Sequence, residues 1–176
     1  MRTISGLIAA AAIVCSAVAQ AAANDTFPLR SDTFSNGATI PVANTYDEMG
    51  CTGNNVSPDL HWSGAPSATK SFALTVFDPD ARKGSGWWHW VVYGISPSRT
   101  SIGAGEKNIG TEGVTSFGTA GYGGPCPPPG DTPHHYIFTL YALDDSVTGS
   151  LDGPHLLDAI KGHVLAKAVL VGRFGR

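Results

Sequence analysis

Two histidines, a tyrosine and an aspartate stand where strand-like segments begin or end, and together they could bind a small anion. Asp78 ends an apolar segment and precedes a proline, which biases Asp78 towards an extended backbone. His89 lies between two tryptophans at the start of a second segment. Side chains alternate along a strand, so His134 and Tyr136 in a third segment point to one face and His135 to the other. An imidazolium can donate hydrogen bonds to an anion, and we expect a neighbouring Asp78 to keep His89 protonated.

Each of these residues also has a purely structural interpretation. Asp78 could accept hydrogen bonds from nearby backbone in a turn, although Asp80 suits that role better. His89 could be a hydrogen-bonded residue of the core. The tryptophans at positions 87, 88 and 90 are most simply core and pocket-wall residues, and one of them could stack on a ligand cation.

The loop of residues 121–133, which leads into His134, is rich in glycine and proline. Its prolines fix φ and remove N–H donors, while its glycines allow the backbone to approach a ligand closely. The pattern predicts a stiff rim whose polar groups face inward, which suits the capture of a small anion. The residues that we expect to form this rim are Gly124, Pro125, Cys126 and Pro127.

Length and composition favour a single, loop-rich β domain. The chain has 176 residues, which is typical of one domain with a substantial core. Its formal net charge of −3 provides no electrostatic basis for binding nucleic acid. Only 14% of the residues are charged, whereas 22 are glycine and 12 are proline, and this balance favours a mainly β protein.

Residues 1–23 are interpreted as a secretory signal peptide rather than as part of the fold. A basic start is followed by an apolar run to Val18, with small-x-small cleavage sites near residues 19–23. A retained anchor helix is the alternative, but the run is short for a span of about 20 residues. The residues before Cys15 suit a lipidation site poorly. We therefore expect residues 24–176 to form a periplasmic or secreted bacterial domain with no integral membrane segment.

Two cysteines, Cys51 and Cys126, remain in the expected mature chain. In an oxidising compartment they could form a disulfide, or they could stay apart as two buried thiols, because their distance cannot be derived from the sequence. A bridge would close a loop of about 75 residues and stabilise the fold by roughly 2–4 kcal/mol.

Strand-like composition recurs along the chain. The segments rich in β-branched and aromatic residues are 71–77, 90–95, 136–143 and 166–174. Both faces of the third segment are apolar, so we expect a central strand that is covered on both sides. Residues 154–163 have the apolar spacing of a helix, with Asp152 as its N-cap. Residues 96–116 are predicted to form a long loop over the site.

Several short motifs follow one another at characteristic separations. They are Phe-Asp-Pro-Asp-Ala-Arg at 77–82, Gly-Trp-Trp-His-Trp-Val-Val-Tyr at 86–93, Gly-Pro-Cys-Pro-Pro-Pro-Gly at 124–130 and His-His-Tyr at 134–136, with shorter matches at 51–58, 60–62 and 162–166. Over residues 27–176 the chain resembles the phosphatidylethanolamine-binding protein family, and its bacterial Raf-kinase-inhibitor-like branch in particular. The resemblance implies one mainly β domain with a large antiparallel sheet, a smaller sheet and a few peripheral helices.

The resemblance also implies a ligand pocket. In the family, a small anion pocket is lined by the positions that match Asp78, His89, His134 and Tyr136, and the loop matching residues 124–128 adds backbone to it. That pocket binds phosphate, acetate or the phosphoryl group of an ethanolamine phospholipid head. This chain departs from the family at Arg82, where a proline is common, and at His135, where many relatives have arginine. Arg82 adds a cation at the rim, which could be solvated or could strengthen anion capture.

We therefore predict a non-catalytic protein that binds a small anion or a phospholipid head group, with no cofactor and no metal. Imidazolium groups and backbone donors would hold the anion, so affinity should fall as the pH rises through the histidine pKa values. A protein partner that it inhibits or modulates, and formation of a homodimer, are left open.

Two other functions remain as alternatives. A hydrolase could use the Asp, His and Tyr side chains as acid–base groups, or Cys126 as a nucleophile if its thiol is free. The chain has no Gly-x-Ser-x-Gly motif to support that reading. A zinc site formed by Asp78, His89 and His134 is the third hypothesis, and no His-x-x-x-His or Cys-x-x-Cys spacing supports it.

Overall fold

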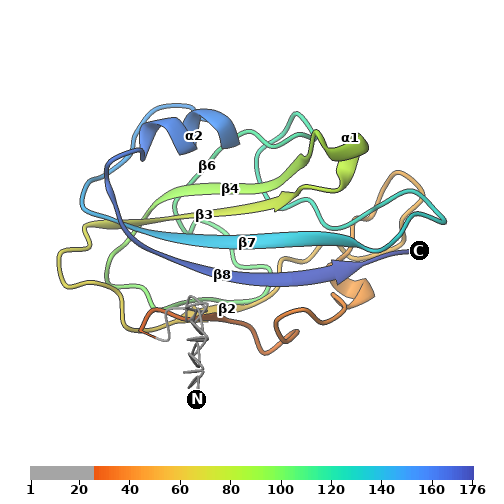
Figure 1. Ribbon diagram of the computed structural model, residues 1–176, viewed down its shortest axis with the longest axis horizontal. Helices are drawn as coiled ribbons and strands as arrows, with labels where there is room; N and C mark the ends of the chain where they lie inside the picture. The colour runs from red at the N-terminus through yellow and green to blue at the C-terminus, as the bar shows by residue number, and fades with distance from the viewer. Residues whose placement is uncertain (1–25) are drawn as a thin grey trace, which may run out of the picture.

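The computed structural model describes residues 26–176, so the predicted signal peptide at residues 1–23 lies outside the described residues. The described chain is mainly β, and it confirms the predicted large antiparallel sheet with a smaller sheet and a few helices. The large sheet has the strand order β6-β4-β3-β7-β8, and the small sheet has the order β1-β2-β5 (Figure 1). Within residues 26–176, no helix has both the length and the apolar character that crossing a membrane requires.

Long strands form the large sheet, whereas the small sheet has strands of two or three residues. The large sheet consists of β3 (Ser71–Asp78), β4 (Trp87–Ile95), β6 (Thr111–Glu112), β7 (His134–Leu143) and β8 (Val164–Phe174). The small sheet consists of β1 (Leu29–Arg30), β2 (Leu60–Trp62) and β5 (Ser101–Ile102). The helical segments are η1 (Val42–Asn44), α1 (Ala81–Gly84) and α2 (Gly153–Ala159).

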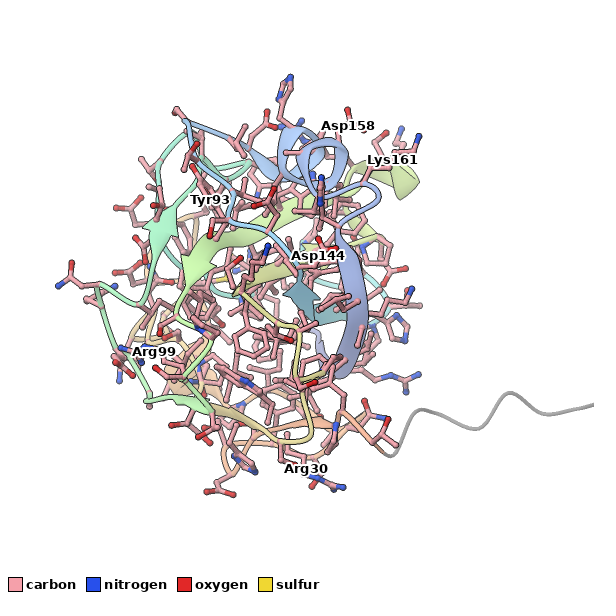
Figure 2. The ribbon with its side chains drawn as sticks, turned by 90° about the vertical axis from the view of Figure 1, so that its left-hand side faces the viewer. Arg30, Tyr93, Arg99, Asp144, Asp158 and Lys161 are labelled. Atoms are coloured by element: carbon pink, nitrogen blue, oxygen red, sulfur yellow. A yellow bond between two sulfur atoms is a disulfide. The ribbon has the colours of Figure 1, made fainter. Side chains whose placement is uncertain are left out.

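The main core lies between the two sheets. Residues of one face of β3 and β7, such as Leu74 and Phe138, pack there with Trp62 of β2. A second, smaller core lies on the other face of the large sheet, where Tyr93 packs with Leu156 of α2. Figure 2 shows side chains filling this interior, while labelled charged side chains such as Arg30, Arg99 and Lys161 lie at the surface.

β7 is central, as predicted, because it pairs with β3 on one side and with β8 on the other. Its two faces differ in burial. Phe138 and Leu140 on the inner face are fully buried, whereas Ile137 and Tyr141 on the outer face are only partly buried. The outer face is therefore covered less completely than the inner one, with Leu143 and Tyr141 packed in the second core that includes α2.

All four predicted strands occur, and β4 differs most from its prediction. It begins at Trp87 rather than at residue 90, because it continues to pair with the end of β3. In that register Trp88 lies opposite Phe77, and Trp87 lies opposite Asp78. The pairing brings the start of β4, which contains His89, to the same edge of the sheet as Asp78.

The predicted helix forms, but it is shorter than expected. The carboxylate of Asp152 accepts the backbone N–H of His155 at 3.0 Å and caps the N-terminus of α2, as predicted. The helix ends at Ala159 rather than at residue 163. Gly162 has φ = +88°, a left-handed conformation that turns the chain out of the helix and into β8.

Candidate functional site

A pocket of about 490 Å³ opens where β3 ends and where β4 and β7 begin, beside α1 at the right of Figure 1. All four side chains predicted to bind the ligand line it: Asp78, His89, His134 and Tyr136. Residues 96–116 do not line this pocket, so the prediction that they form a loop over the site is wrong. Ile102 and Ile109 hold that segment against the main core instead.

Asp78 and His134 form a buried ion pair or hydrogen bond in the pocket wall. Their side chains are 3% and 7% exposed, and Nδ1 of His134 lies 2.7 Å from Oδ2 of Asp78. The other carboxylate oxygen, Oδ1, accepts the backbone N–H groups of Asp80 at 2.8 Å and Ala81 at 3.1 Å. Asp78 therefore forms the turn into α1, the structural role considered for it, and also orients the His134 ring. On the far side of that ring, Nε2 lies 3.6 Å from Oδ2 of Asp131.

His89 is neutral, contrary to the prediction from the sequence. Its ring is buried, and Nδ1 donates a hydrogen bond to the carbonyl of Gly123 at 2.7 Å. Burial lowers the pKa of His89 to about 4, and it outweighs the opposite effects of the Gly123 and Gly124 backbone and of the charge on Asp78. The expected protonation by Asp78 fails because that carboxylate is paired with His134 instead. Among the hydrogen bonds of residues 26–176 none involves Nε2 of His89, although the Gly124 backbone lies close enough to the ring to raise its pKa.

Tyr136 packs edge-on against His89, with ring centroids 5.1 Å apart. Its hydroxyl is buried and has no hydrogen-bond partner in the described part of the chain. Burial raises the pKa of this hydroxyl, and the negative charge of Asp78 adds to the effect, so the group remains protonated. The indole N–H of Trp87, another pocket residue, is likewise buried without a partner among residues 26–176. Such groups normally have a partner, so they mark positions for ligand atoms or water.

The glycine- and proline-rich loop forms only part of the rim that was predicted. Gly124 donates its N–H to Oδ1 of Asn55 at 2.8 Å, and the carbonyl of Pro125 accepts the N–H of Tyr46 at 3.0 Å. Gly124 and Pro125 do not line the pocket, and their contribution to ligand binding stays a prediction. The part of the loop that does line the pocket consists of Cys126, Pro127 and Pro128.

Two links attach this loop to the preceding segment around residue 50. Cys126 forms a disulfide with Cys51, one of the two alternatives left open by the sequence, with a Cα–Cα distance of 5.9 Å. Arg176 donates from Nε to a carbonyl of the loop at 2.6 Å and from Nη1 to the carbonyl of Gly50 at 2.5 Å. These links hold Met49 in the pocket wall. Neither Met49 nor Arg176 was identified from the sequence, because neither belongs to a motif.

α1 places two cations on the opposite rim. The guanidinium of Arg82 is exposed and lies over the Trp87 ring, 4.3 Å from its centroid, so it is stacked rather than simply solvated. Arg82 and Lys83 have φ values of +51° and +57°, a left-handed conformation that residues other than glycine seldom adopt. His135 points away from His134, as alternation predicts, and its Nδ1 lies 2.9 Å from Asp80.

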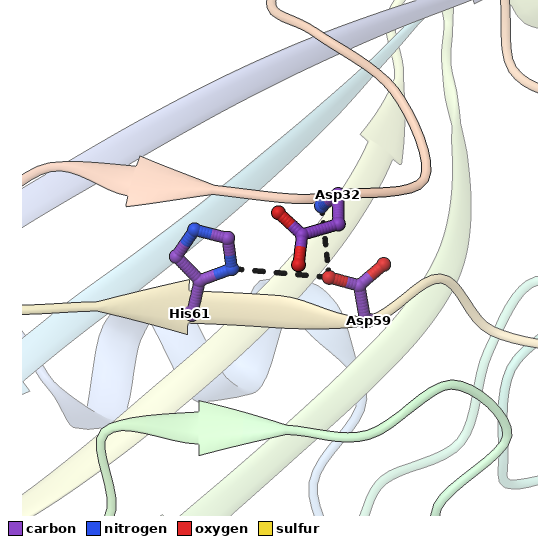
Figure 3. Close-up of side chains that lie close together, drawn as sticks. All are labelled: Asp32, Asp59 and His61. Atoms are coloured by element: carbon purple, nitrogen blue, oxygen red, sulfur yellow. Dashed lines mark hydrogen bonds and ion pairs between the residues drawn. The ribbon is translucent and has the colours of Figure 1, made fainter.

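A second group of polar side chains lies at the start of the small sheet. Potential ligand atoms of Asp32, Asp59 and His61 are within 4.8 Å of one another (Figure 3). The Asp59 carboxylate accepts backbone N–H groups of Asp32 at 2.9 Å and Thr33 at 3.0 Å, and also the hydroxyls of Ser31 and Thr33. Burial raises the pKa of Asp59, but these hydrogen bonds outweigh it and lower the pKa. The group is explained by this structural role, since Asp59 fixes the turn that follows β1.

Comparisons with known proteins agree with this architecture. The family model described as Phosphatidylethanolamine-binding protein matches residues 30–175. YbcL of Escherichia coli K12, a UPF0098 protein, is 44% identical over 159 residues, covering 81% of this chain and 84% of its own. LppC of Mycobacterium tuberculosis H37Rv, named as a candidate lipoprotein, is 39% identical over 161 residues, covering 90% of this chain and 77% of its own.

A solved structure extends the likeness to the fold. The crystal structure of Escherichia coli YbcL, described as a new member of the mammalian PEBP family, superposes with a TM-score of 0.80 at 37% identity. The superposition covers 86% of this chain and 99% of that one. The chain therefore belongs to the phosphatidylethanolamine-binding protein family.

Proposed function

We propose that this protein binds a small molecule through a phosphate or carboxylate group and performs no chemistry on it. The observation that carries the proposal is the convergence of four polar side chains from three neighbouring strands on one pocket: Asp78, His89, His134 and Tyr136. Two polar groups at that point, His89 Nε2 and the Tyr136 hydroxyl, have no partner within residues 26–176. The two cations of α1 on the rim would attract an anion.

Several features support binding over hydrolysis. The sulfur of Cys126 is held in the disulfide, so it provides no thiolate nucleophile. Among residues 26–176, those that line the pocket include no serine and no threonine. A hydrolase would therefore depend on water activated by His134. Analysis of the ligand by phosphorus NMR after long incubation with the protein distinguishes the two functions, because a binding protein leaves the ligand intact.

We also propose that the protein acts outside the cytoplasm. The signal-peptide pattern of residues 1–23 and the disulfide both favour an oxidising compartment, and one relative is named as a candidate lipoprotein. Fractionation of cells that express the full chain tests this, and a cytoplasmic location would contradict it. Modulation of a partner protein and homodimer formation stay as predictions, to be tested by co-purification and by light scattering.

Calorimetric titration of the purified protein with phosphorylethanolamine and with inorganic phosphate tests the binding function. Tyr136→Phe removes a hydroxyl that has no partner within residues 26–176, so it should leave the fold stable. We expect it to weaken binding by roughly 10-fold, the effect of losing one hydrogen bond to a charged group. Tyr141→Phe, on the outer face of β7, is the matched control and should bind normally. Failure of the unmodified protein to bind any phosphate or carboxylate would refute the proposal.

A further inference from the structure

The hydrogen bonding of His89 limits what this pocket can recognise. A carbonyl oxygen can only accept, so the 2.7 Å contact with Gly123 assigns the single proton of the neutral ring to Nδ1. Nε2 then carries a lone pair and is an acceptor. The ring lines the pocket, and Nε2 is its only polar atom without a partner among residues 26–176. A ligand atom that reaches Nε2 must therefore bring a hydrogen of its own.

This requirement separates two kinds of oxyanion. Sulfate and phosphodiesters have no acidic hydrogen near neutral pH, so their oxygens would face the His89 lone pair and repel it. Dihydrogen phosphate and the monoanion of a phosphomonoester carry a P–OH group, which can donate to Nε2 while the remaining oxygens accept. The Tyr136 hydroxyl, buried and without a partner in the described residues, can donate to one of those oxygens.

The charges around His89 also disfavour a fully ionised ligand. The ionisable groups that line the pocket with it are Asp78, Asp80, Arg82, Lys83, Asp131, His134 and Tyr136. Three of these are carboxylates, whereas only the two residues of α1 are permanent cations. Asp78 is the least exposed of the three carboxylates, since its side chain is 3% exposed, and its charge would oppose a dianion at the same end of the pocket. A singly charged ligand that is a hydrogen-bond donor avoids both the repulsion by Asp78 and the contact of two acceptors at His89 Nε2.

We propose that the pocket selects oxyanions that carry a proton, such as the monoanions of phosphate and of phosphomonoesters, because a P–OH group donates to His89 Nε2. This inference rests on the proposed function and narrows it, because an intact phospholipid head, which is a phosphodiester, and an ionised carboxylate both lack the required hydrogen and are poor ligands. Phosphomonoesters and inorganic phosphate share the required chemistry, and phosphorylethanolamine compared with phosphate distinguishes these two sources.

Calorimetry of the unmodified protein at pH 6 tests the selection with two pairs of ligands. Phosphate is compared with sulfate, which has nearly the same size and shape. Phosphorylethanolamine is compared with glycerophosphorylethanolamine, which has the same amine but a diester phosphate. We expect sulfate and the diester to bind roughly 10- to 100-fold more weakly, the cost of replacing one hydrogen bond near a charge by two facing acceptors. Equal affinities for phosphate and sulfate would overturn the inference and leave the proposed function intact, whereas no binding of any ligand would overturn both.

The dependence on pH locates the proton. A phosphomonoester loses its second proton with a pKa of about 6, so its apparent affinity should fall about tenfold per pH unit above that value. An alkylphosphonate, which loses this proton at higher pH, should show the same fall displaced to higher pH. A fall at one fixed pH for both ligands would mean that the protein titrates rather than the ligand, and it would overturn the inference.

His89→Gln provides a test within the protein. A glutamine amide can turn either its oxygen or its NH₂ group towards the pocket, so the obligatory acceptor is lost. We expect the ratio of phosphate to sulfate affinity to fall to within about threefold, while His163→Gln, an exposed site outside the pocket, keeps the ratio of the unmodified protein. An unchanged ratio in a folded His89→Gln protein would overturn the assignment to His89. If that variant does not fold, the two ligand pairs on the unmodified protein still decide the question.

Discussion

Acidification from pH 7 to pH 4 should destabilise the folded protein through His89. In an unfolded chain a histidine has a pKa of about 6.5, whereas burial lowers the pKa of His89 in the fold to about 4. Between these values the unfolded chain takes up a proton that the folded chain does not, so the free energy of unfolding falls as the pH falls. The difference between the two pKa values corresponds to about 3 kcal/mol of stability. This stability is present in full above about pH 6.5 and is lost in full below about pH 4.

Replacement of His89 by asparagine isolates this contribution. The asparagine NH₂ group can occupy the position of Nδ1 and donate to Gly123, but it does not titrate. Its smaller side chain should lower stability by roughly 1–3 kcal/mol at pH 7, and this cost should not depend on pH. Urea unfolding at pH 7, 6, 5 and 4, followed by tryptophan fluorescence, measures both proteins. We expect the unmodified protein to lose about 3 kcal/mol more than His89→Asn over this range.

Other acidic groups do not obscure the comparison. Hydrogen bonds lower the pKa values of Asp59 and Asp80 despite the raising effect of their burial, so both groups weaken the fold at low pH. They do so equally in the unmodified protein and in His89→Asn. Their effect therefore cancels when the free energies of unfolding of the two proteins are subtracted. His163→Asn, at an exposed site, is the control, and its free energy of unfolding should depend on pH as that of the unmodified protein does. If the curves of His89→Asn and the unmodified protein run parallel, His89 is not held neutral by burial, and the reasoning for its acceptor role fails.

Three further perturbations test the rim of the pocket. Replacing Cys51 and Cys126 by serine removes a link across 75 residues and should lower the free energy of unfolding by about 4 kcal/mol in urea titrations. Arg176→Ala frees the carbonyls of Pro127, Gly50 and Met49, and calorimetry should show phosphate binding weakened by roughly 3- to 10-fold with a smaller change in stability. Arg82 has φ = +51°, which proline cannot adopt. Arg82→Pro should therefore melt about 3 °C or more below Arg82→Gly, which relieves the left-handed strain.

The strands were predictable because each carries its own local pattern. The apolar run before Asp78 and the alternation after His134 identify β3 and β7, and Asp152 identifies the start of α2. The resemblance to the family placed all four polar residues in one pocket. Contacts between distant segments were not predictable. The N–H of Gly124 is taken by Asn55, which lies 69 residues earlier in the chain, and Arg176 reaches a carbonyl 126 residues before it.

The protonation of His89 was mispredicted because a carboxylate can hold only a limited number of partners. Asp78 was expected to keep His89 charged, but the start of β7 delivers His134 to the same carboxylate, where its Nδ1 lies 2.7 Å from Oδ2. The remaining oxygen is occupied by two backbone N–H groups of the turn. The charge of Asp78 therefore raises the pKa of His89 only weakly, while burial lowers that pKa more strongly. Residue types alone suggest a cationic cradle, but the pairing of Asp78 with His134 leaves Nε2 of His89 as a hydrogen-bond acceptor, and the ligand that we propose differs accordingly.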